Sequence, residues 1–257
     1  MAFRFASLGS GSRGNATVIE AGETRVLVDC GFAARELLGR CDHLGLDPAG
    51  LSAILVTHEH GDHMRGVGAV ARRFNLPVWM THGTRHAADF GRLPDLQLFS
   101  SHGGDLTIGG LRITPVPVPH DAREPTQFVF EHAGTRLGLL TDIGSITPRV
   151  VAAFDGVDAL LLECNHDADM LASGPYPPSL QARVGGQYGH LNNAQAADFL
   201  RRIDHRRLRH LVGAHLSEKN NSPELVLAAL AAVSEGLDDC LSLLLQDQAS
   251  DWFPITA

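Results

Sequence analysis

Short apolar runs, separated by glycine, proline and aspartate, fill the first two thirds of the chain. Most runs have the length and the β-branched or aromatic content of a buried strand. Gly22 and Glu23 mark a tight turn between two of these runs. The strands that the pattern predicts are Phe3–Leu8, Thr17–Glu20, Val26–Asp29, Ser52–Val56, Val78–Met80, Leu96–Phe99, Leu111–Val118, Gln127–Glu131, Arg136–Leu140, Ala159–Leu162 and Leu208–Ala214.

A helical spacing of apolar positions becomes more frequent in the last third of the chain. The last helix has clear start signals, since Ser222 can cap it, Pro223 suits the first helical position and Glu224 falls in the first turn. The predicted helices are Ala33–Arg40, Arg65–Phe74, Ala194–Arg202 and Glu224–Val233.

The order of these elements predicts the fold class. Strands come in clusters with helices between them, and no linker, low-complexity tract or short repeat interrupts the pattern. The chain has 257 residues, of which 44% are hydrophobic and 19% charged, and this suffices for a large core. We therefore predict the α+β class: an αββα sandwich of two mixed β-sheets with helices on the outer faces, formed by residues 1–257 as one domain.

Charge and composition narrow the class of protein. The formal net charge of -8 disfavours a protein that grips nucleic acid over a broad basic surface. Residues 1–15 lack the apolar core of a signal peptide, and no stretch approaches the ~20 apolar residues of a membrane span. The four cysteines are isolated, without paired spacing. We expect a cytoplasmic protein without a membrane partner.

Residues 57–63, with the sequence THEHGDH, concentrate side chains that bind metals. Three of the 14 histidines, His58, His60 and His63, stand here together with Asp62. The segment follows a predicted buried strand and precedes a predicted helix, so a loop can direct these side chains to one point. Neutral imidazole and carboxylate are ligands for zinc, manganese and iron ions. A polar surface loop is the alternative, but it would carry this set only by coincidence.

The string HEHGDH resembles the HxHxDH signature of the metallo-β-lactamase superfamily. The other residues of the superfamily pattern follow in the same order, each close to the end of a predicted strand: Asp29, His120, Asp142 and His215. A single histidine or aspartate after a strand is more often a capping or solvated side chain. The joint pattern therefore carries the resemblance.

The resemblance implies a hydrolase with two divalent metal ions, zinc or manganese, with iron as an alternative. Two cations that lie a few ångströms apart need a shared anionic ligand and a bridging hydroxide, and this hydroxide would be the nucleophile. Redox members of the superfamily carry glutamate where this chain has His60, which favours hydrolysis. Asp29 would orient a ligating histidine from behind. The implied ligands are His58, His60 and His120 for one ion, Asp62, His63 and His215 for the other, and Asp142 for both.

Longer segments are similar to the YycJ/WalJ subfamily, among them LGSGSRGNAT, LLECNHD, GHLNNAQAA and HLSEKNNSPE. That resemblance implies phosphodiester hydrolysis, in the form of exonuclease action on double-stranded DNA from the 5′ end. Nucleic acid, with DNA favoured, is then the expected partner. The inserted β-CASP domain of some related nucleases has no counterpart in the sequence.

Several residues are candidates for substrate contact or proton transfer. The loop Gly9–Asn15 is rich in donors and can offer backbone N–H groups to a phosphate, although an ordinary turn is the alternative. His190, in the segment GHLNN, is the candidate for protonating a leaving oxygen, with a structural histidine as the alternative. The substrate-binding candidates are Ser10, Ser12, Asn15, Asn165 and His190, and the catalytic candidates are Asp62 and His190.

Two other functions stay open at this point. Thioester or lactam hydrolysis uses the same ligands, so the histidine cluster does not separate it from phosphodiester hydrolysis. A non-catalytic binding or regulatory protein on the same fold is the alternative of another class, but such relatives usually lack ligands and none is missing here. The glycine-rich loop and the GHLNN segment favour phosphate.

Overall fold

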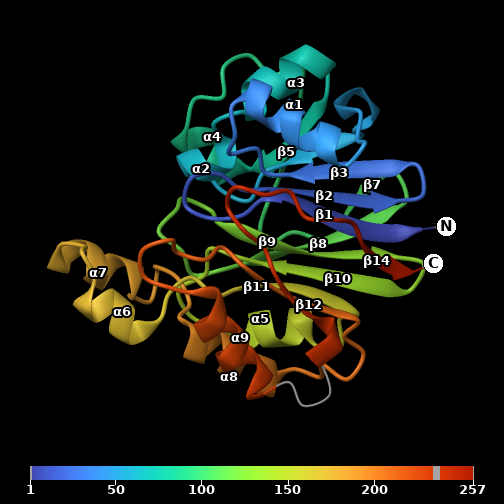
Figure 1. The fold of residues 1–257 in the computed structure, drawn as a ribbon. Helices are drawn as coiled ribbons and strands as arrows, with labels where there is room; N and C mark the ends of the chain where they lie inside the picture. The colour runs from blue at the N-terminus through green and yellow to red at the C-terminus, as the bar shows by residue number, and fades with distance from the viewer. Residues whose placement is uncertain (1, 234–237, 257) are drawn as a thin grey trace.

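The computed structural model describes residues 2–233 and 238–256, and its centre is a pair of β-sheets packed face to face (Figure 1). Each sheet has seven strands. In spatial order, the first sheet consists of β14 (Phe253–Thr256), β1 (Phe3–Gly9), β2 (Ala16–Ala21), β3 (Thr24–Val28), β4 (Ala53–Leu55), β5 (Pro77–Thr81) and β6 (Asp95–Phe99). The second consists of β13 (Leu241–Leu243), β12 (His210–Ala214), β11 (Ala159–Glu163), β10 (Thr135–Leu140), β9 (Thr126–His132), β8 (Leu111–Pro117) and β7 (Leu106–Ile108).

Both sheets are mixed. Strands β14 to β3 pair antiparallel, and strands β3 to β6 pair parallel. In the second sheet, β7 to β10 are antiparallel and β10 to β13 are parallel. Antiparallel neighbours need only short turns, whereas parallel neighbours need longer crossovers, which contain the helices. Since parallel strands run the same way, their carboxyl ends lie side by side at one edge of each sheet.

The main core lies between the two sheets. Phe3 and Phe5 of β1 and Phe128 and Phe130 of β9 are fully buried there. Ile19 belongs to this core. Its neighbour Val18 faces the other side of the sheet, where it joins a second buried apolar cluster, because successive side chains of a strand point to opposite faces. Both sheets contribute to this core, and on this ground we propose that the chain is one domain.

Helices cover both outer faces (Figure 1). Near the first sheet lie α1 (Ala34–His43), α2 (Gly61–Met64), α3 (Val67–Phe74) and α4 (His82–Ala87). Near the second lie α5 (Pro148–Phe154), α8 (Asn193–Arg202) and α9 (Pro223–Ala231). The short helices α6 (Ala168–Ser173) and α7 (Pro178–Val184) extend to the side on which α2 lies, away from the chain termini (Figure 1). Two 3₁₀ turns, Pro48–Gly50 and Asp238–Cys240, complete the order.

A row of charges crosses the first sheet. Glu20 on β2 lies opposite Arg4 on β1 and Arg25 on β3, and each arginine Nε is 2.6 Å from a Glu20 carboxylate oxygen. Burial alone would raise the pKa of Glu20, but the hydrogen bonds and charges of the two arginines outweigh it and lower that pKa. Opposite charges paired across strands in this way stabilise the sheet.

The predicted fold class, an αββα sandwich of mixed sheets, is confirmed. The Ser222 hydroxyl caps α9 as expected, accepting a hydrogen bond from the Leu225 N–H. The predicted helix Arg65–Phe74 is wrong at its start, because the chain forms α2 first and α3 begins only at Val67. Gly66 lies between the two helices. The backbone of Phe32 approaches it so closely that a Cβ at this position would lie 2.1 Å from the Phe32 carbonyl oxygen.

The sequence pattern missed several short elements. They are the strands β7, β13 and β14 and the helices α2, α4, α5, α6 and α7. Each has seven residues or fewer, which is too short for a periodic pattern to stand out.

Candidate metal centre

Strand ends bring the sequence-predicted ligands together. Asp29 directly follows β3. His58 comes three residues after β4, the strand that pairs in parallel with β3. In the second sheet, Asp142 follows β10 and His215 follows β12, with β11 between them. The carboxyl ends of parallel strands are where ligands bind in such sheets. The two sheets thus place their polar strand ends at a common site.

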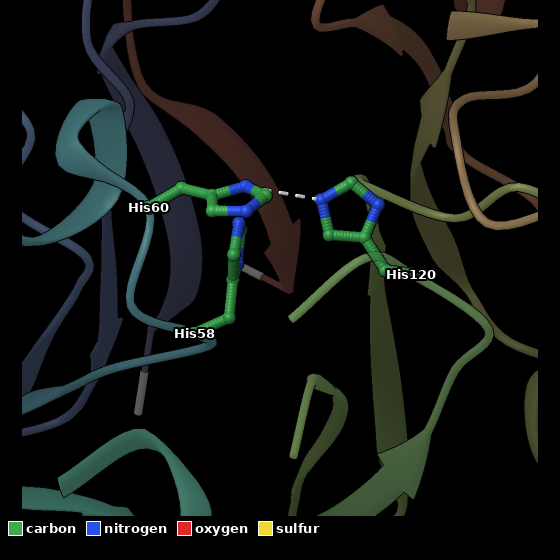
Figure 2. Close-up of side chains that lie close together, drawn as sticks. All are labelled: His58, His60 and His120. Atoms are coloured by element: carbon green, nitrogen blue, oxygen red, sulfur yellow. Dashed lines mark hydrogen bonds between the residues drawn. The ribbon is translucent and has the colours of Figure 1, made fainter. Parts of the chain in front are cut away.

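His58, His60 and His120 form the first group (Figure 2). The first two come from the loop after β4, and His120 faces them from the loop after β8. His60 Nδ1 lies 3.3 Å from His120 Nε2, and each of the three residues offers a nitrogen within 4.8 Å of the others. Three imidazoles gathered this closely match the donor set of a transition-metal or zinc ion.

Asp62, His63 and His215 form a second group with the same spacing. Asp142 lies between the two groups: its carboxylate oxygens are 3.3 Å from His63 Nε2, 3.4 Å from His215 Nδ1 and 3.9 Å from His120 Nε2. The structure therefore brings all seven sequence-predicted ligands into one cluster, with an aspartate in the position of a shared ligand.

Hydrogen bonds from outside the cluster fix how each imidazole faces it. For His58, His63, His120 and His215, Nδ1 contacts a protein oxygen at 2.8 to 3.0 Å. His60 is turned the other way, with Nε2 donating to the Asp121 carbonyl oxygen at 3.2 Å. A nitrogen that donates outward leaves the other ring nitrogen as an acceptor. The ring nitrogens that face into the cluster, four Nε2 atoms and one Nδ1 atom, are the atoms that can ligate a cation.

Unpartnered buried atoms test whether the cluster fits a metal. His58 Nε2, Asp142 Oδ2 and His215 Nε2 are buried without any hydrogen-bond partner among the described residues. Buried polar atoms are almost always satisfied, so three orphans in one cluster require an explanation. All three are acceptors or potential metal donors aimed at the same place. The residues present fit a divalent cation.

Asp29 supports the cluster from behind. One of its oxygens accepts the Thr57 N–H at 2.8 Å, and the other accepts His63 Nδ1–H at 2.8 Å. Burial raises the pKa of Asp29, against the opposing effect of His63. Burial would lower the pKa of His63, but the charges of Asp142, Asp62 and Asp29 outweigh it and raise that pKa well above its usual value. Asp29 thus holds the His63 ring by its Nδ1 atom.

Glu163 was not predicted from the sequence, and it is the most connected carboxylate of the site. It is fully buried, and its oxygens accept hydrogen bonds from His190 Nδ1 at 2.8 Å and His215 Nδ1 at 2.9 Å. Three backbone N–H groups, those of Asp142, Ile143 and Leu191, also donate to it at 3.0 to 3.1 Å. Burial would raise the pKa of Glu163, but its histidine partners hold it at about 2. A glutamate at the end of the apolar run ALLLE was the available signal.

A cavity of about 300 Å³ opens beside the cluster. His60, Asp62, Asp142, His190 and His215 line it, together with Ser12 and residues of α7. Arg183 of α7 is the one arginine or lysine among its described lining residues, and its Nε lies 2.5 Å from an Asp121 carboxylate oxygen. The cavity thus combines a cluster suited to cations with one exposed guanidinium.

The structure changes the interpretation of the loop Gly9–Asn15. Six of its seven backbone N–H groups already donate to protein acceptors, and the group of Ser12 is the exception. The loop is therefore a poor phosphate cradle, because its donors are in use. Ser12 alone of the loop lines the cavity.

The other substrate-binding candidates support the cluster. Ser10 Oγ accepts the His215 N–H at 2.9 Å, and the Asn165 side chain donates to the His215 carbonyl oxygen at 3.0 Å. Asn15 Nδ2 lies 3.1 Å from His63 Nε2 and 3.0 Å from the Gly11 carbonyl oxygen. None of these three is among the described residues that line the cavity. They hold the ligands in place and are not positioned to contact a substrate there. His190 does line the cavity, and it is held by Glu163.

Comparison with known proteins places this site in a family. Residues 24–212 match the family described as "Beta-lactamase superfamily domain". The chain therefore belongs to the β-lactamase superfamily, whose fold and histidine–aspartate cluster it shares.

Two curated relatives are similar over most of the chain. It is 35% identical to a protein named "Exodeoxyribonuclease YycJ" from Bacillus anthracis, over 91% of this chain and 90% of that one. It is 33% identical to "Exodeoxyribonuclease WalJ" from Streptococcus pneumoniae serotype 2, over 87% of this chain and 85% of that one. The metallo-β-lactamase fold protein YhfI from Bacillus subtilis superposes with a TM-score of 0.76 at 17% identity, covering 97% and 99% of the two chains, and this likeness shows the fold. The described residues include no helix of the length and hydropathy that crossing a membrane requires.

Proposed function

We propose that the protein is a divalent-metal-dependent phosphodiesterase that degrades DNA as an exonuclease from the 5′ end. The observation that carries this proposal is the complete cluster around Asp142 in a chain that resembles named exodeoxyribonucleases along nearly its whole length. The 5′ polarity rests on the subfamily resemblance of its sequence segments.

The proposed ligands follow from the ring nitrogens that face into the cluster. His58 Nε2, His60 Nδ1 and His120 Nε2 would hold one ion, and the group of Asp62, His63 and His215 a second. Asp142 lies close to both groups and would serve both ions. Zinc and manganese suit this donor set, with iron as the alternative. When bound, such a metal pair activates a water molecule and stabilises the negative charge on a reacting phosphate.

Residues of the chain itself would supply the remaining steps. Asp62, a member of the second group, lines the cavity and would orient the attacking water. Arg183 would bind a non-bridging phosphate oxygen, as the one guanidinium or ammonium group among the described lining residues. His190 Nδ1 is held by Glu163, which leaves Nε2 to protonate the leaving oxygen.

An acidic protein needs a local attraction to bind a polyanion. The chain has a formal net charge of -8, so its overall field repels DNA. Two divalent ions and Arg183 would attract phosphate at the cavity alone. Few phosphate contacts also imply a shallow dependence of affinity on salt concentration.

Cleavage of matched substrates tests the proposal. One preparation loaded with Mn²⁺ or Zn²⁺ is given 5′- and 3′-labelled single- and double-stranded DNA, RNA, bis(p-nitrophenyl) phosphate, a thioester and a β-lactam. We expect mononucleotides to be released from the 5′ end of DNA. Rapid thioester or lactam cleavage, with no action on any nucleic acid or simple phosphodiester, would contradict the proposal and favour the alternative hydrolase.

The state of the cysteines bears on the cellular compartment of the protein. The four cysteines are all unpaired thiols, and Cys30, Cys41 and Cys164 are buried. Free thiols persist in a reducing compartment. We therefore propose a cytoplasmic protein, in which a DNA substrate is accessible.

A further inference from the structure

A second hollow is lined by residues that neighbour the metal cavity's lining in sequence, and we call it the Tyr188 groove. It has a volume of about 400 Å³, and its lining includes Pro119, Ser145, Gln187 and Tyr188. Pro119 immediately precedes His120, and Tyr188 is followed by Gly189 and His190, which line the metal cavity. Since consecutive Cα atoms are about 3.8 Å apart, the Tyr188 and His190 Cα atoms lie within roughly 8 Å of each other. Adjacent residues of one turn therefore line both hollows, so a strand in the metal cavity would need to extend by about one or two nucleotides to reach the groove.

The main chain beneath Tyr188 is held in place while its ring faces solvent. Ser145 Oγ donates to the Gln187 carbonyl oxygen at 3.1 Å, and the His190 N–H donates to the Val184 carbonyl oxygen at 2.8 Å. Gly144 packs against the same turn so closely that a Cβ there would lie 2.5 Å from the Gln187 carbonyl group. Tyr188 is nevertheless 63% exposed. A large ring presented to water on a fixed turn contributes little to folding and is ready to stack on a flat ligand.

The charge of the groove is opposite to that of the whole protein. Arg149 and His102 also line it, and Arg149 Nη1 lies 3.4 Å from His102 Nδ1. No carboxylate occurs among its described lining residues, although the protein as a whole carries a formal net charge of -8. An anionic ligand is therefore tolerated here despite the overall negative charge of the protein.

We propose that the Tyr188 groove binds a nucleotide of the substrate strand next to the cleaved bond. Its base stacks on Tyr188, and its phosphate contacts Arg149. An aromatic ring beside a cation, without carboxylates, is the combination used to bind single-stranded nucleic acid. Every base has a flat face, so this site accepts any sequence. The inference rests on the proposed nuclease function and extends it to a binding site outside the metal cavity.

Tyr188→Ala and Tyr188→Phe test the stacking. The Km for a single-stranded oligonucleotide, divided by the Km for bis(p-nitrophenyl) phosphate, should rise roughly 5- to 100-fold in Tyr188→Ala, the range that base stacking on an aromatic ring supports. Tyr188→Phe keeps the ring and should stay within about 3-fold of wild type. Leu225→Ala is the matched control, because Leu225 is an exposed apolar residue on α9 (39% exposed). It should leave the ratio unchanged.

Arg149→Gln and Arg149→Lys test the phosphate contact. The Kd of a labelled phosphorothioate oligonucleotide is measured by fluorescence anisotropy at several salt concentrations. Arg149→Gln should weaken binding and reduce the slope of log K against log salt by about 0.7, the value for one phosphate contact on a single strand. Arg149→Lys should keep the slope.

The outcomes separate this inference from the proposed function. If wild type cleaves DNA but Tyr188→Ala leaves both the Km ratio and the oligonucleotide Kd unchanged, the groove assignment is wrong and the nuclease function stands. Equal losses on the oligonucleotide and on bis(p-nitrophenyl) phosphate would show that Tyr188 supports the fold and would also overturn the assignment. Wild-type protein that neither cleaves nor binds nucleic acid would overturn both.

Discussion

Replacing Glu163 by glutamine should damage both the fold and the metal site, although the two side chains have almost the same shape. One Glu163 oxygen accepts from His190, His215 and the Asp142 N–H, and the other from the Ile143 and Leu191 N–H groups. Every neighbour is a donor. The amide NH₂ of glutamine is itself a donor, so in either orientation it faces at least two N–H groups that have lost their acceptor.

The magnitude follows from the number of broken bonds. A buried polar group left without its partner costs about 1–3 kcal/mol, so two such groups give a loss of about 2–6 kcal/mol in the free energy of unfolding. That is a large share of the roughly 5–15 kcal/mol that a typical domain has. His215 also loses the acceptor that orients it, and loss of such a partner commonly weakens metal affinity by about 10- to 100-fold.

Urea denaturation, followed by circular dichroism, measures the first effect, and metal titration of the apoprotein measures the second. Glu23→Gln is the matched control, since Glu23 is exposed at the hairpin turn between β2 and β3. It should change neither quantity. If Glu163→Gln unfolds at the wild-type urea concentration and binds metal with wild-type affinity, the hydrogen-bond network around Glu163 does not support the metal site.

Four further predictions concern individual side chains. Metal analysis should find two ions per wild-type chain and fewer in His58→Ala and in His215→Ala, and chelation should lower the wild-type Tm; two ions in both variants would contradict the ligand assignment. Asp62→Asn should lower kcat at least 100-fold with a smaller change in Km, and steady-state kinetics showing near-normal kcat would exclude its role at the attacking water. Arg183→Gln should raise the Km for DNA about 10-fold and Arg183→Lys less, as initial rates at low salt would show; equal effects of both would indicate that geometry and not charge matters. Glu20→Gln should lower the unfolding free energy by about 1–2 kcal/mol near neutral pH. Because the folded-state pKa of Glu20 is lowered, its contribution is present above the unfolded pKa near 4.5 and is lost as pH falls below it. Urea curves of wild type and Glu20→Gln should therefore converge in acid, and a constant difference would disprove the linkage.

The ligand cluster could be predicted because its chemistry is concentrated in the sequence. His58, His60, Asp62 and His63 lie close together in the chain, in the loop after β4 and in the short helix α2 that follows it. Asp142 and His215 follow apolar strands, and parallel strands end at the same edge. The residue types and the strand pattern together were enough.

The supporting residues could not be predicted in the same way. The loop Gly9–Asn15 looked suited to phosphate, but Leu245 and Gln246, more than 230 positions later, take up two of its N–H groups. Glu163 ends an apolar strand, and only the folded chain shows that five donors surround it. Arg183 reaches the cavity because α7 lines it, and α7 is too short for its position to be foreseen.

The backbone conformation at the site has an energetic cost for the fold. Asp29, Asp142 and His215 all have positive φ, at 60°, 51° and 57°, and they are three of the five such non-glycine residues in the described part of the chain. A left-handed conformation costs an L-residue about 1–2 kcal/mol, and glycine would avoid that cost. Each of the three follows a strand at the common edge, where a left-handed residue breaks the alternation of faces and turns the side chain toward the cluster. Their side chains are also almost fully buried, which adds the cost of removing charge from water. A fold under selection for stability alone would have no reason to keep aspartate and histidine at these positions. Because strain and buried charge coincide at the three strand ends that meet there, the cluster is best explained as a binding site for cations, which compensate both costs when they bind.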